Sequence, residues 1–236
     1  MPSVPVAPGR LGEDLPHSRI RRAIAARMAE SKRTVPHFYT TVAVRMDEAE
    51  KLRAALALRD PAARVSVTHL VVKAAALALE RWPRVNGTFE EERIRIPAEI
   101  GIGVAVAMED GLLVAVVHDC AGRTLSDLAR ETREAVARVR SGRPGQEDLQ
   151  GGTFSISNMG MFPVEQFSAI ITPPQAAILA VGGIADEPVV REGRVEPGRV
   201  MRLTLSADHR VIDGALAASF LAEVRGLLEN PLALVI

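Results

Sequence analysis

The pattern of apolar and polar positions predicts helices and strands that alternate along the chain. Apolar residues recur every three or four positions, which is the helical period, in residues 18–35, 47–59, 70–81, 125–139 and 215–228. Short apolar or alternating runs, which are typical of strands, occupy residues 38–44, 94–96, 100–108, 112–117, 153–157, 176–184 and 200–207. This interleaved order favours a single α/β or α+β domain.

Turn and cap residues lie at the ends of these segments. Asp110-Gly111 between two apolar runs is a strong hairpin signal, and a polar hairpin is predicted near Glu192-Gly193. The helix at 70–81 is apolar on most sides, so we expect it to lie centrally in the fold. The predicted helix N-caps are Asp47, Ser66 or Thr68, and Thr124.

The first sixteen residues differ from the rest of the chain. They hold four prolines and two glycines and have no apolar period, which favours an extended linker or arm. We therefore predict a linker over residues 1–16 and one folded domain over residues 17–236. The start of the chain has neither the charged region nor the long apolar core of a secretory signal, and a cytoplasmic location is the prediction.

Charge and cysteine content argue against several classes of function. The 236 residues include 29 basic and 29 acidic residues, so no overall field favours nucleic acid or an anionic membrane. Glu109 and Asp110 split the apolar runs, and no segment is predicted to span a bilayer. Cys120 is the only cysteine and no two histidines have H-x-x-x-H spacing, so we predict no metal site.

His209 is the main catalytic candidate, because it lies where a predicted strand meets a predicted helix. A neutral imidazole can accept a proton near pH 7. If the strand stays extended, positions 203, 205, 207 and 209 share one face. The His209 ring would then project from an apolar surface, where desolvation keeps the imidazole neutral. A histidine at a strand end is more often structural. Asp213 can orient the ring or anchor the turn to an arginine, and we favour the anchor.

A second polar cluster is formed by Thr153, Ser155 and Ser157, which alternate with apolar residues. Three hydroxyls on one strand face are usually only a solvated face, although they can also donate a hydrogen bond to a developing oxyanion. Spacing in the sequence alone does not bring Ser157 to His209. Cys120 is read as a packed or idle thiol rather than a nucleophile, and no G-x-S-x-G motif is present.

Five blocks of the sequence resemble one family. The run His209-Arg210-Val211-Ile212-Asp213-Gly214 is similar to the H-x-x-x-D-G signature of the catalytic domain of dihydrolipoamide acyltransferases, the core subunits of 2-oxo acid dehydrogenase complexes. Chloramphenicol acetyltransferase shares the signature and the fold. The resemblance extends over residues 17–236, and the other blocks are residues 21–32, 36–39, 151–158 and 173–179.

The resemblance implies a two-layer fold like that of chloramphenicol acetyltransferase, with helices packed on a mixed sheet, and an acyl transfer between two thiols. His209 would be the general base that deprotonates coenzyme A or dihydrolipoamide. Ser157 would donate a hydrogen bond to the oxyanion, with Ser155 as the fallback. Asp213 would be structural and tied to an arginine of the first helix, most plausibly Arg21. Coenzyme A is thus implied as a substrate, and no metal is needed.

The resemblance also implies a homotrimer, with His209 of one subunit facing Ser157 of the next. Trimers of this family join through their C-terminal ends into larger hollow cores. The apolar tail 232–236 fits that use, and packing on its own subunit is nearly as good an interpretation. The implied partners are lipoyl domains, which this chain lacks, and the other subunits of the complex; nucleic acid and membrane are not among them.

The acyl group and the setting leave alternatives open. Residues 155–162 and 167–171 look most like the acetyltransferases of pyruvate dehydrogenase complexes, with branched-chain and succinyl versions as alternatives. A stand-alone coenzyme A-dependent acetyltransferase of small molecules is a second hypothesis. A non-enzymatic scaffold with a vestigial site is a third, and the intact His209 and Ser157 speak against it.

Overall fold

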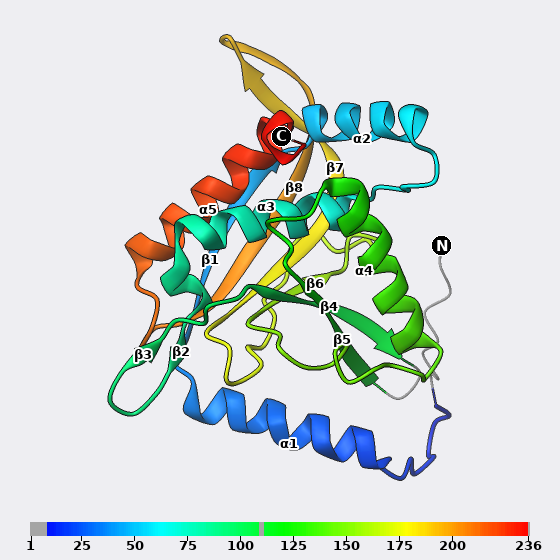
Figure 1. Ribbon diagram of the computed structural model, residues 1–236, viewed down its shortest axis with the longest axis vertical. Coiled ribbons are helices and arrows are strands. Elements are labelled where there is room, and N and C mark those ends of the chain that lie inside the picture. Colours follow the sequence, from blue (N-terminus) through cyan, green and yellow to red (C-terminus); the bar gives the residue numbers. More distant parts are fainter. Residues whose placement is uncertain (1–8, 109–110, 236) are drawn as a thin grey trace.

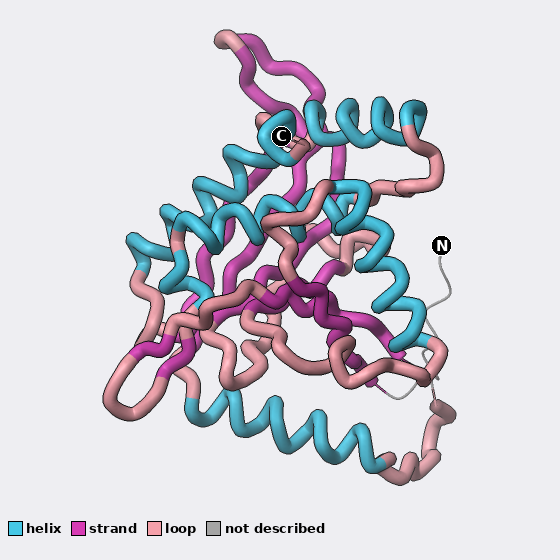
Figure 2. The backbone as a smooth tube through the Cα atoms, in the orientation of Figure 1, coloured by secondary structure: helices cyan, strands magenta, loops and turns pink. Residues whose placement is uncertain are grey.

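A six-stranded mixed sheet forms the centre of the computed structural model, which describes residues 9–108 and 111–235. The sheet order is β1-β8-β7-β6-β4-β5 (Figures 1 and 2). Its strands are β1 (His37–Arg45), β4 (Gly101–Met108), β5 (Gly111–His118), β6 (Phe154–Asn158), β7 (Ala177–Arg191) and β8 (Arg194–Asp208). Strands β2 (Thr88–Phe89) and β3 (Ile94–Arg95) form a separate two-stranded sheet.

Helices provide the second layer of the fold, which consists of α2 (Asp47–Arg59), α3 (Val67–Arg81), α4 (Leu125–Arg140) and α5 (Gly214–Glu229) (Figure 1). Helix α1 (Arg19–Thr34) lies apart from this layer (Figure 1), and the short 3-10 helices are η1 (Pro83–Asn86) and η2 (Pro231–Leu234). Strand β6 pairs in parallel with β4 and β7, and the other pairs in the large sheet are antiparallel. The predicted mixed sheet with helices packed on it is confirmed.

Helix α3 is buried between the sheet and its neighbouring helices, as its apolar pattern predicted. Ten of its fifteen residues are buried, and the apolar ones among them join β4, β6, β7, β8 and α5 in one hydrophobic cluster. Side chains such as Leu70, Leu79, Phe154 and Phe220 are shielded completely from solvent. Full burial of such a side chain contributes roughly 1.5–3 kcal/mol, so this cluster is the main source of stability and fixes the sheet behind the candidate site.

Two of the three predicted helix caps are correct. The Thr124 hydroxyl accepts a hydrogen bond from the Asp127 amide at the start of α4. Ser66 caps α3 in a capping box in which the side chain of His69 accepts from the Ser66 amide. The prediction for Asp47 is wrong: Met46 holds the N-cap position, because the Asp47 carboxylate is drawn to the β7–β8 hairpin.

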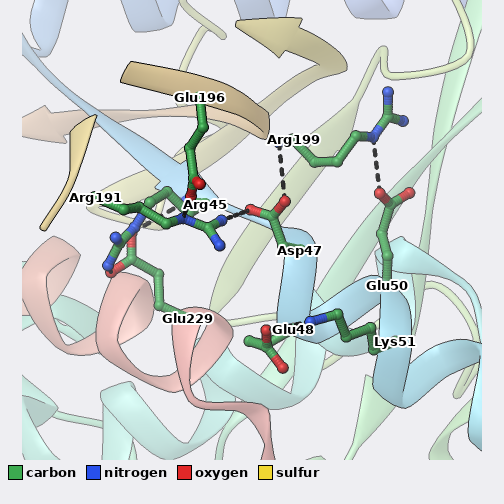
Figure 3. Close-up of polar contacts among 9 residues, drawn as sticks. All are labelled: Arg45, Asp47, Glu48, Glu50, Lys51, Arg191, Glu196, Arg199 and Glu229. Atoms are coloured by element: carbon green, nitrogen blue, oxygen red, sulfur yellow. Dashed lines mark hydrogen bonds and ion pairs between the residues drawn. The ribbon is translucent and has the colours of Figure 1, made fainter. Parts of the chain in front are cut away.

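The β7–β8 hairpin extends well beyond the strands predicted at 176–184 and 200–207. Charged residues and prolines interrupt the apolar alternation there, so the sequence pattern ended too early. Ion pairs hold the outer part of the hairpin to α2: Arg191 pairs with Asp47 at 2.7 Å and Arg199 with Glu50 at 2.9 Å (Figure 3). The predicted turn at Glu192-Gly193 is confirmed, and both residues have positive φ values.

Three predicted features fall partly on residues that the structure does not describe. They are residues 1–8 of the predicted linker, Glu109-Asp110 of the first hairpin, and Ile236 of the tail. In the rest of the tail, Leu234 is buried and Leu232 is 70% exposed. None of the described helices has the length and apolar character needed to cross a bilayer.

Candidate active site

The turn that carries His209 follows directly from the end of β8. The strand ends at Asp208, and α5 begins at Gly214. The amides of Val211 and Ile212 both donate to the Asp208 carbonyl, at 3.0 and 2.9 Å, and both side chains are fully buried. The His209 amide donates to the Pro36 carbonyl at 3.0 Å. Backbone bonds and two buried side chains therefore fix the turn.

The side chain of Asp208, for which the sequence suggested no role, holds this turn through Arg210. Asp208 is 3% exposed, and its two oxygens accept from Arg210 Nε at 3.0 Å and Nη2 at 2.7 Å. The hydrogen bond that Arg210 donates to Asp208 raises the pKa of the Arg210 guanidinium. That group also lies 4.1 Å from the ring centroid of Phe89, a favourable cation–π geometry. Arg210 thus connects the turn to the β2–β3 hairpin.

The His209 ring is more exposed in the single chain than the strand pattern predicted. Leu203, Leu205 and Ala207 are buried on one face of β8, as expected. The strand ends before His209, and the ring turns out of that face. It lies against the Phe38 ring, with the two centroids 4.7 Å apart. One side of the imidazole is therefore supported, while the other is open to a ligand or to a second chain.

Asp213 serves as the N-cap of α5, which differs from the role expected for it. Its Oδ1 accepts from the Leu216 amide at 2.9 Å. Within the described residues of one chain, Asp213 forms no ion pair with Arg21, so the expected tie to the first helix is wrong for the isolated chain. A capping aspartate stabilises a helix start by about 1 kcal/mol. Asp213 therefore fixes where the turn that carries His209 ends.

Ser155 and Ser157 lie on one face of β6, but their hydroxyls have different surroundings. Ser155 is 2% exposed, and its Oγ donates to Gln175 Oε1 at 2.6 Å. Gln175 Nε2 in turn donates to the Gly152 carbonyl at 2.9 Å. Ser157 is half-buried. Because the Ser155 hydroxyl already donates its hydrogen to Gln175, Ser157 is the better candidate for donating a hydrogen bond to an oxyanion.

His209 and Ser157 are far apart within one chain. Ser157 is paired with Ala180 of β7, and Ala180 is paired with Thr204 of β8. His209 comes five residues after Thr204. At the usual spacings in sheets, the two residues are separated by roughly 16 Å along the strands and about 10 Å across them. One thioester does not reach both side chains of the same chain, so a shared site requires a second chain.

A cavity of about 430 Å³ lies beside the serine-bearing face of β6. Ser155, Gln175 and Arg27 contribute to its wall. Arg27 Nη2 donates to the Pro173 carbonyl at 2.6 Å, which fixes the segment before Gln175. The cavity combines apolar and hydrogen-bonding groups, as small-molecule sites commonly do, and Ser155 rather than Ser157 contributes to its lining.

Cys120 and the histidines add no second catalytic centre. Cys120 is fully buried, and burial raises its thiol pKa to about 12, which confirms that it is a packed residue and a poor nucleophile. Between residues 9 and 108 and between 111 and 235, no cluster of three or more His, Cys, Asp and Glu side chains has metal-site geometry.

Sequence reasoning missed Asp208, Arg210 and Gln175 as site residues. The sequence signal for Asp208 was its position directly before His209. Gln175 lies in the Pro173-Pro174-Gln175 block that was quoted only as a resemblance. The positions of Gln175 and Arg210 do not reveal their respective partners Ser155 and Phe89, because these come from strands that only the tertiary fold brings close.

Comparison with known proteins gives a consistent result. The family model of the 2-oxoacid dehydrogenases acyltransferase (catalytic domain) matches residues 10–236. The chain is 46% identical to the dihydrolipoyllysine-residue acetyltransferase component of the mitochondrial pyruvate dehydrogenase complex of Schizosaccharomyces pombe, over 96% of this chain and 47% of the relative. It is 43% identical to the corresponding component of Zymomonas mobilis, over 98% and 54%. The chain thus spans about half the length of these relatives.

Solved structures show the same likeness. The dihydrolipoamide acetyltransferase of Azotobacter vinelandii, whose structure was determined to investigate a serine, a histidine and an asparagine in its catalytic mechanism, superposes with a TM-score of 0.90 at 31% identity. The match covers 95% of this chain and 94% of that one. A cubic core of a pyruvate dehydrogenase complex matches equally well. Chloramphenicol acetyltransferase, at 16% identity and a TM-score of 0.55, shares the fold alone.

Proposed function

The chain belongs to the family of catalytic domains of the 2-oxoacid dehydrogenase acyltransferases, and we propose that it transfers an acetyl group between the thiols of dihydrolipoamide and coenzyme A. His209 is the proposed general base and Ser157 the proposed oxyanion donor. Asp213, as the cap of α5, and Asp208, through Arg210, hold the histidine in place.

The observation that carries this proposal is the spacing of the three candidate residues. In the Azotobacter vinelandii enzyme, the investigated histidine follows the serine by 52 positions, and the asparagine follows the histidine by four. Ser157, His209 and Asp213 have the same two spacings. Aspartate in place of asparagine at the last position suits the capping role, because both residues are preferred helix N-caps.

In the proposed reaction, His209 removes the proton from the attacking thiol. The thiolate forms a bond to the thioester carbonyl carbon, and the resulting oxyanion accepts a hydrogen bond from the Ser157 hydroxyl. Collapse of the tetrahedral intermediate breaks the bond to the leaving sulfur, which takes the proton back from the imidazolium. Thiols have pKa values near ~8.5, so a positioned imidazole is a suitable base at neutral pH.

The distance between His209 and Ser157 in one chain supports a site shared by two subunits. We infer a homotrimer in which each site combines His209 of one chain with Ser157 of the next. The likeness to a cubic core supports further assembly of trimers. The exposed Leu232 and Val235 near the C-terminus provide apolar surface for such contacts.

Acetyl is the proposed acyl group because these relatives are acetyltransferase components of pyruvate dehydrogenase complexes. The lipoyl substrate would be presented by a lipoyl domain, and the other subunits of the complex are the proposed partners. The relatives include mitochondrial and bacterial proteins, so the cytoplasmic location is still only a prediction from the sequence.

A direct assay tests the proposed reaction. Purified protein is mixed with acetyl-CoA and dihydrolipoamide, and thioester formation and free coenzyme A are measured. We expect transfer to dihydrolipoamide to exceed transfer to simple alcohols and amines, and acetyl-CoA to exceed isobutyryl- and succinyl-CoA. Replacing His209 by Ala should lower kcat by roughly 100-fold or more. Unchanged transfer by His209→Ala would show that the assigned base is wrong.

Mixing two inactive variants tests the shared site. His209→Ala and Ser157→Ala are unfolded together, refolded as a mixture and assayed. In random trimers with sites between chains, about a quarter of the sites recover both residues, because each site draws on two subunits. A site within one chain recovers none. Each variant refolded alone is the control, and a mixture no more active than these controls contradicts the shared site.

A further inference from the structure

We propose that His37 is a positioning residue that joins the His209 turn to the serine-bearing face of β6 within each chain. This inference rests on the proposed function, since it concerns the two residues assigned to acyl transfer. His37 contacts neither the reacting thiols nor the thioester in that scheme. Its effect is exerted through one hydrogen bond to Ile171, which holds the segment 171–176.

The hydrogen bonds of the His37 ring select one tautomer. The Ile171 amide lies 3.1 Å from His37 Nε2, and His37 Nδ1 lies 2.8 Å from the Val35 carbonyl. An amide N–H only donates, so Nε2 must accept and Nδ1 must carry the proton. A protonated imidazole cannot form the first bond. Partial burial lowers the His37 pKa, which favours the neutral ring that the geometry requires.

On one side, the backbone around His37 forms the support of the His209 turn. Pro36 accepts the hydrogen bond of the His209 amide, and the Phe38 ring packs on the His209 ring. His37 itself is paired with Asp208 in the register of β1 and β8. A shift of the chain at His37 therefore moves the bonds and the ring that orient the proposed base.

On the other side, His37 holds a segment that reaches β6. Ile171 is fully buried, and its carbonyl accepts from Ser31 Oγ at 2.6 Å. Four residues later, the Gln175 side chain accepts a hydrogen bond from the Ser155 hydroxyl on β6. The Ala176 carbonyl accepts a hydrogen bond from the Asp208 amide at 2.8 Å. The segment thus contacts both halves of the site. In the proposed trimer these halves belong to two neighbouring sites, so His37 links one site to the next.

Two substitutions separate this role from simple packing. The side-chain oxygen of His37→Gln reaches about as far as Nε2 and can still accept from the Ile171 amide. His37→Asn is shorter: it can donate to the Val35 carbonyl in place of Nδ1 but leaves the Ile171 amide without an acceptor. We expect Asn to lower kcat on the order of 10- to 100-fold, as for a misplaced reacting group, with KM for coenzyme A unchanged. The His37→Gln variant should retain most of the wild-type kcat. The control is His17→Asn, the same substitution at an exposed position, which should leave kcat unchanged.

Hydrogen exchange of the peptide covering residues 169–175 provides a readout that does not depend on activity. We expect faster exchange at Ile171 in His37→Asn than in wild-type or His37→Gln. Equal exchange in all three proteins, or a kcat of His37→Asn within about twofold of wild-type, would overturn the proposal. If the wild-type protein transfers no acetyl group, the proposed reaction fails. Exchange at Ile171 then still decides whether His37 holds the segment.

Discussion

Protonation of His69 should destabilise the fold in mild acid. His69 is 5% exposed, and its ring accepts a hydrogen bond from the Ser66 amide at 3.0 Å in the capping box of α3. Burial, and then the charge of Arg133, lower the pKa of His69 from 6.5 to about 4. The neutral ring is therefore strongly preferred in the folded protein, whereas the unfolded chain takes up the proton near the ordinary pKa.

The sign and size of the effect follow from linkage between protonation and folding. The contribution of His69 is fully present above pH 6.5 and is lost as the pH falls from there towards 4, because the unfolded state binds the proton first. Each unit of pKa difference corresponds to 1.36 kcal/mol, so the full contribution is about 3 kcal/mol. Between pH 7.5 and pH 5 the expected loss is about 2 kcal/mol. Burial also lowers the pKa of His37, so its protonation adds to the loss of folding stability in acid.

The test replaces His69 by Gln, which does not titrate and can still accept from the Ser66 amide, as in common capping boxes. The free energy of unfolding is measured by urea denaturation at pH 7.5 and pH 5, at one protein concentration so that assembly contributes equally. We expect wild-type to lose about 2 kcal/mol more than His69→Gln over this range. His17→Gln, at an exposed position, should behave like wild-type. Equal losses for wild-type and His69→Gln would refute the reasoning.

Three further outcomes are expected. Asp208→Asn should cost about 1–3 kcal/mol of stability, because the buried carboxylate that accepts from Arg210 is replaced by a neutral amide, and it should lower kcat. Glu90→Gln, which disrupts pairs at the surface, should destabilise the protein less in the same denaturation experiment. Asp213→Ala should lower stability by about 1 kcal/mol, whereas Asp213→Asn should be near wild-type; equal effects would contradict the capping role. Leu232→Asp should reduce the particle mass measured by light scattering without lowering the stability of the subunit, and an unchanged mass would exclude Leu232 from the contacts between trimers.

Several features of the fold were determined by local sequence alone. The five helices, the apolar parts of the strands of the large sheet and the cap at Thr124 follow from periodicity and from side chains that satisfy the first amides of a helix. For the α3 cap, the sequence left Ser66 or Thr68 open, and the structure selects Ser66. The central position of α3 followed from its apolar surface. His209 and Ser157 were identifiable as candidates because each lies in a short polar block beside a predicted strand, within a run that resembles the family.

Other features depended on contacts between segments that are distant in sequence. The N-cap prediction for Asp47 failed because Arg191, about 140 positions away, pairs with its carboxylate. The outer β7–β8 hairpin was missed because ion pairs to α2, rather than an apolar face, hold it in place. The sequence pattern placed His209 on the apolar face of an extended strand, but the residue is exposed. Strand β8 ends one residue before it, at Asp208, and the His209 amide donates to the Pro36 carbonyl.

The division between the two levels has a physical reason. Local sequence determines which backbone conformation each segment prefers, and it thereby defined the elements and the junction that carries His209. Which serine hydroxyl is already bonded, which aromatic ring Arg210 contacts, and which amide donates to His37 depend on sheet order and register. Those are set only when β6, β7 and β8 pack together. The same sheet order separates His209 from Ser157, and this separation is the tertiary feature on which the proposal of a site shared by two chains rests.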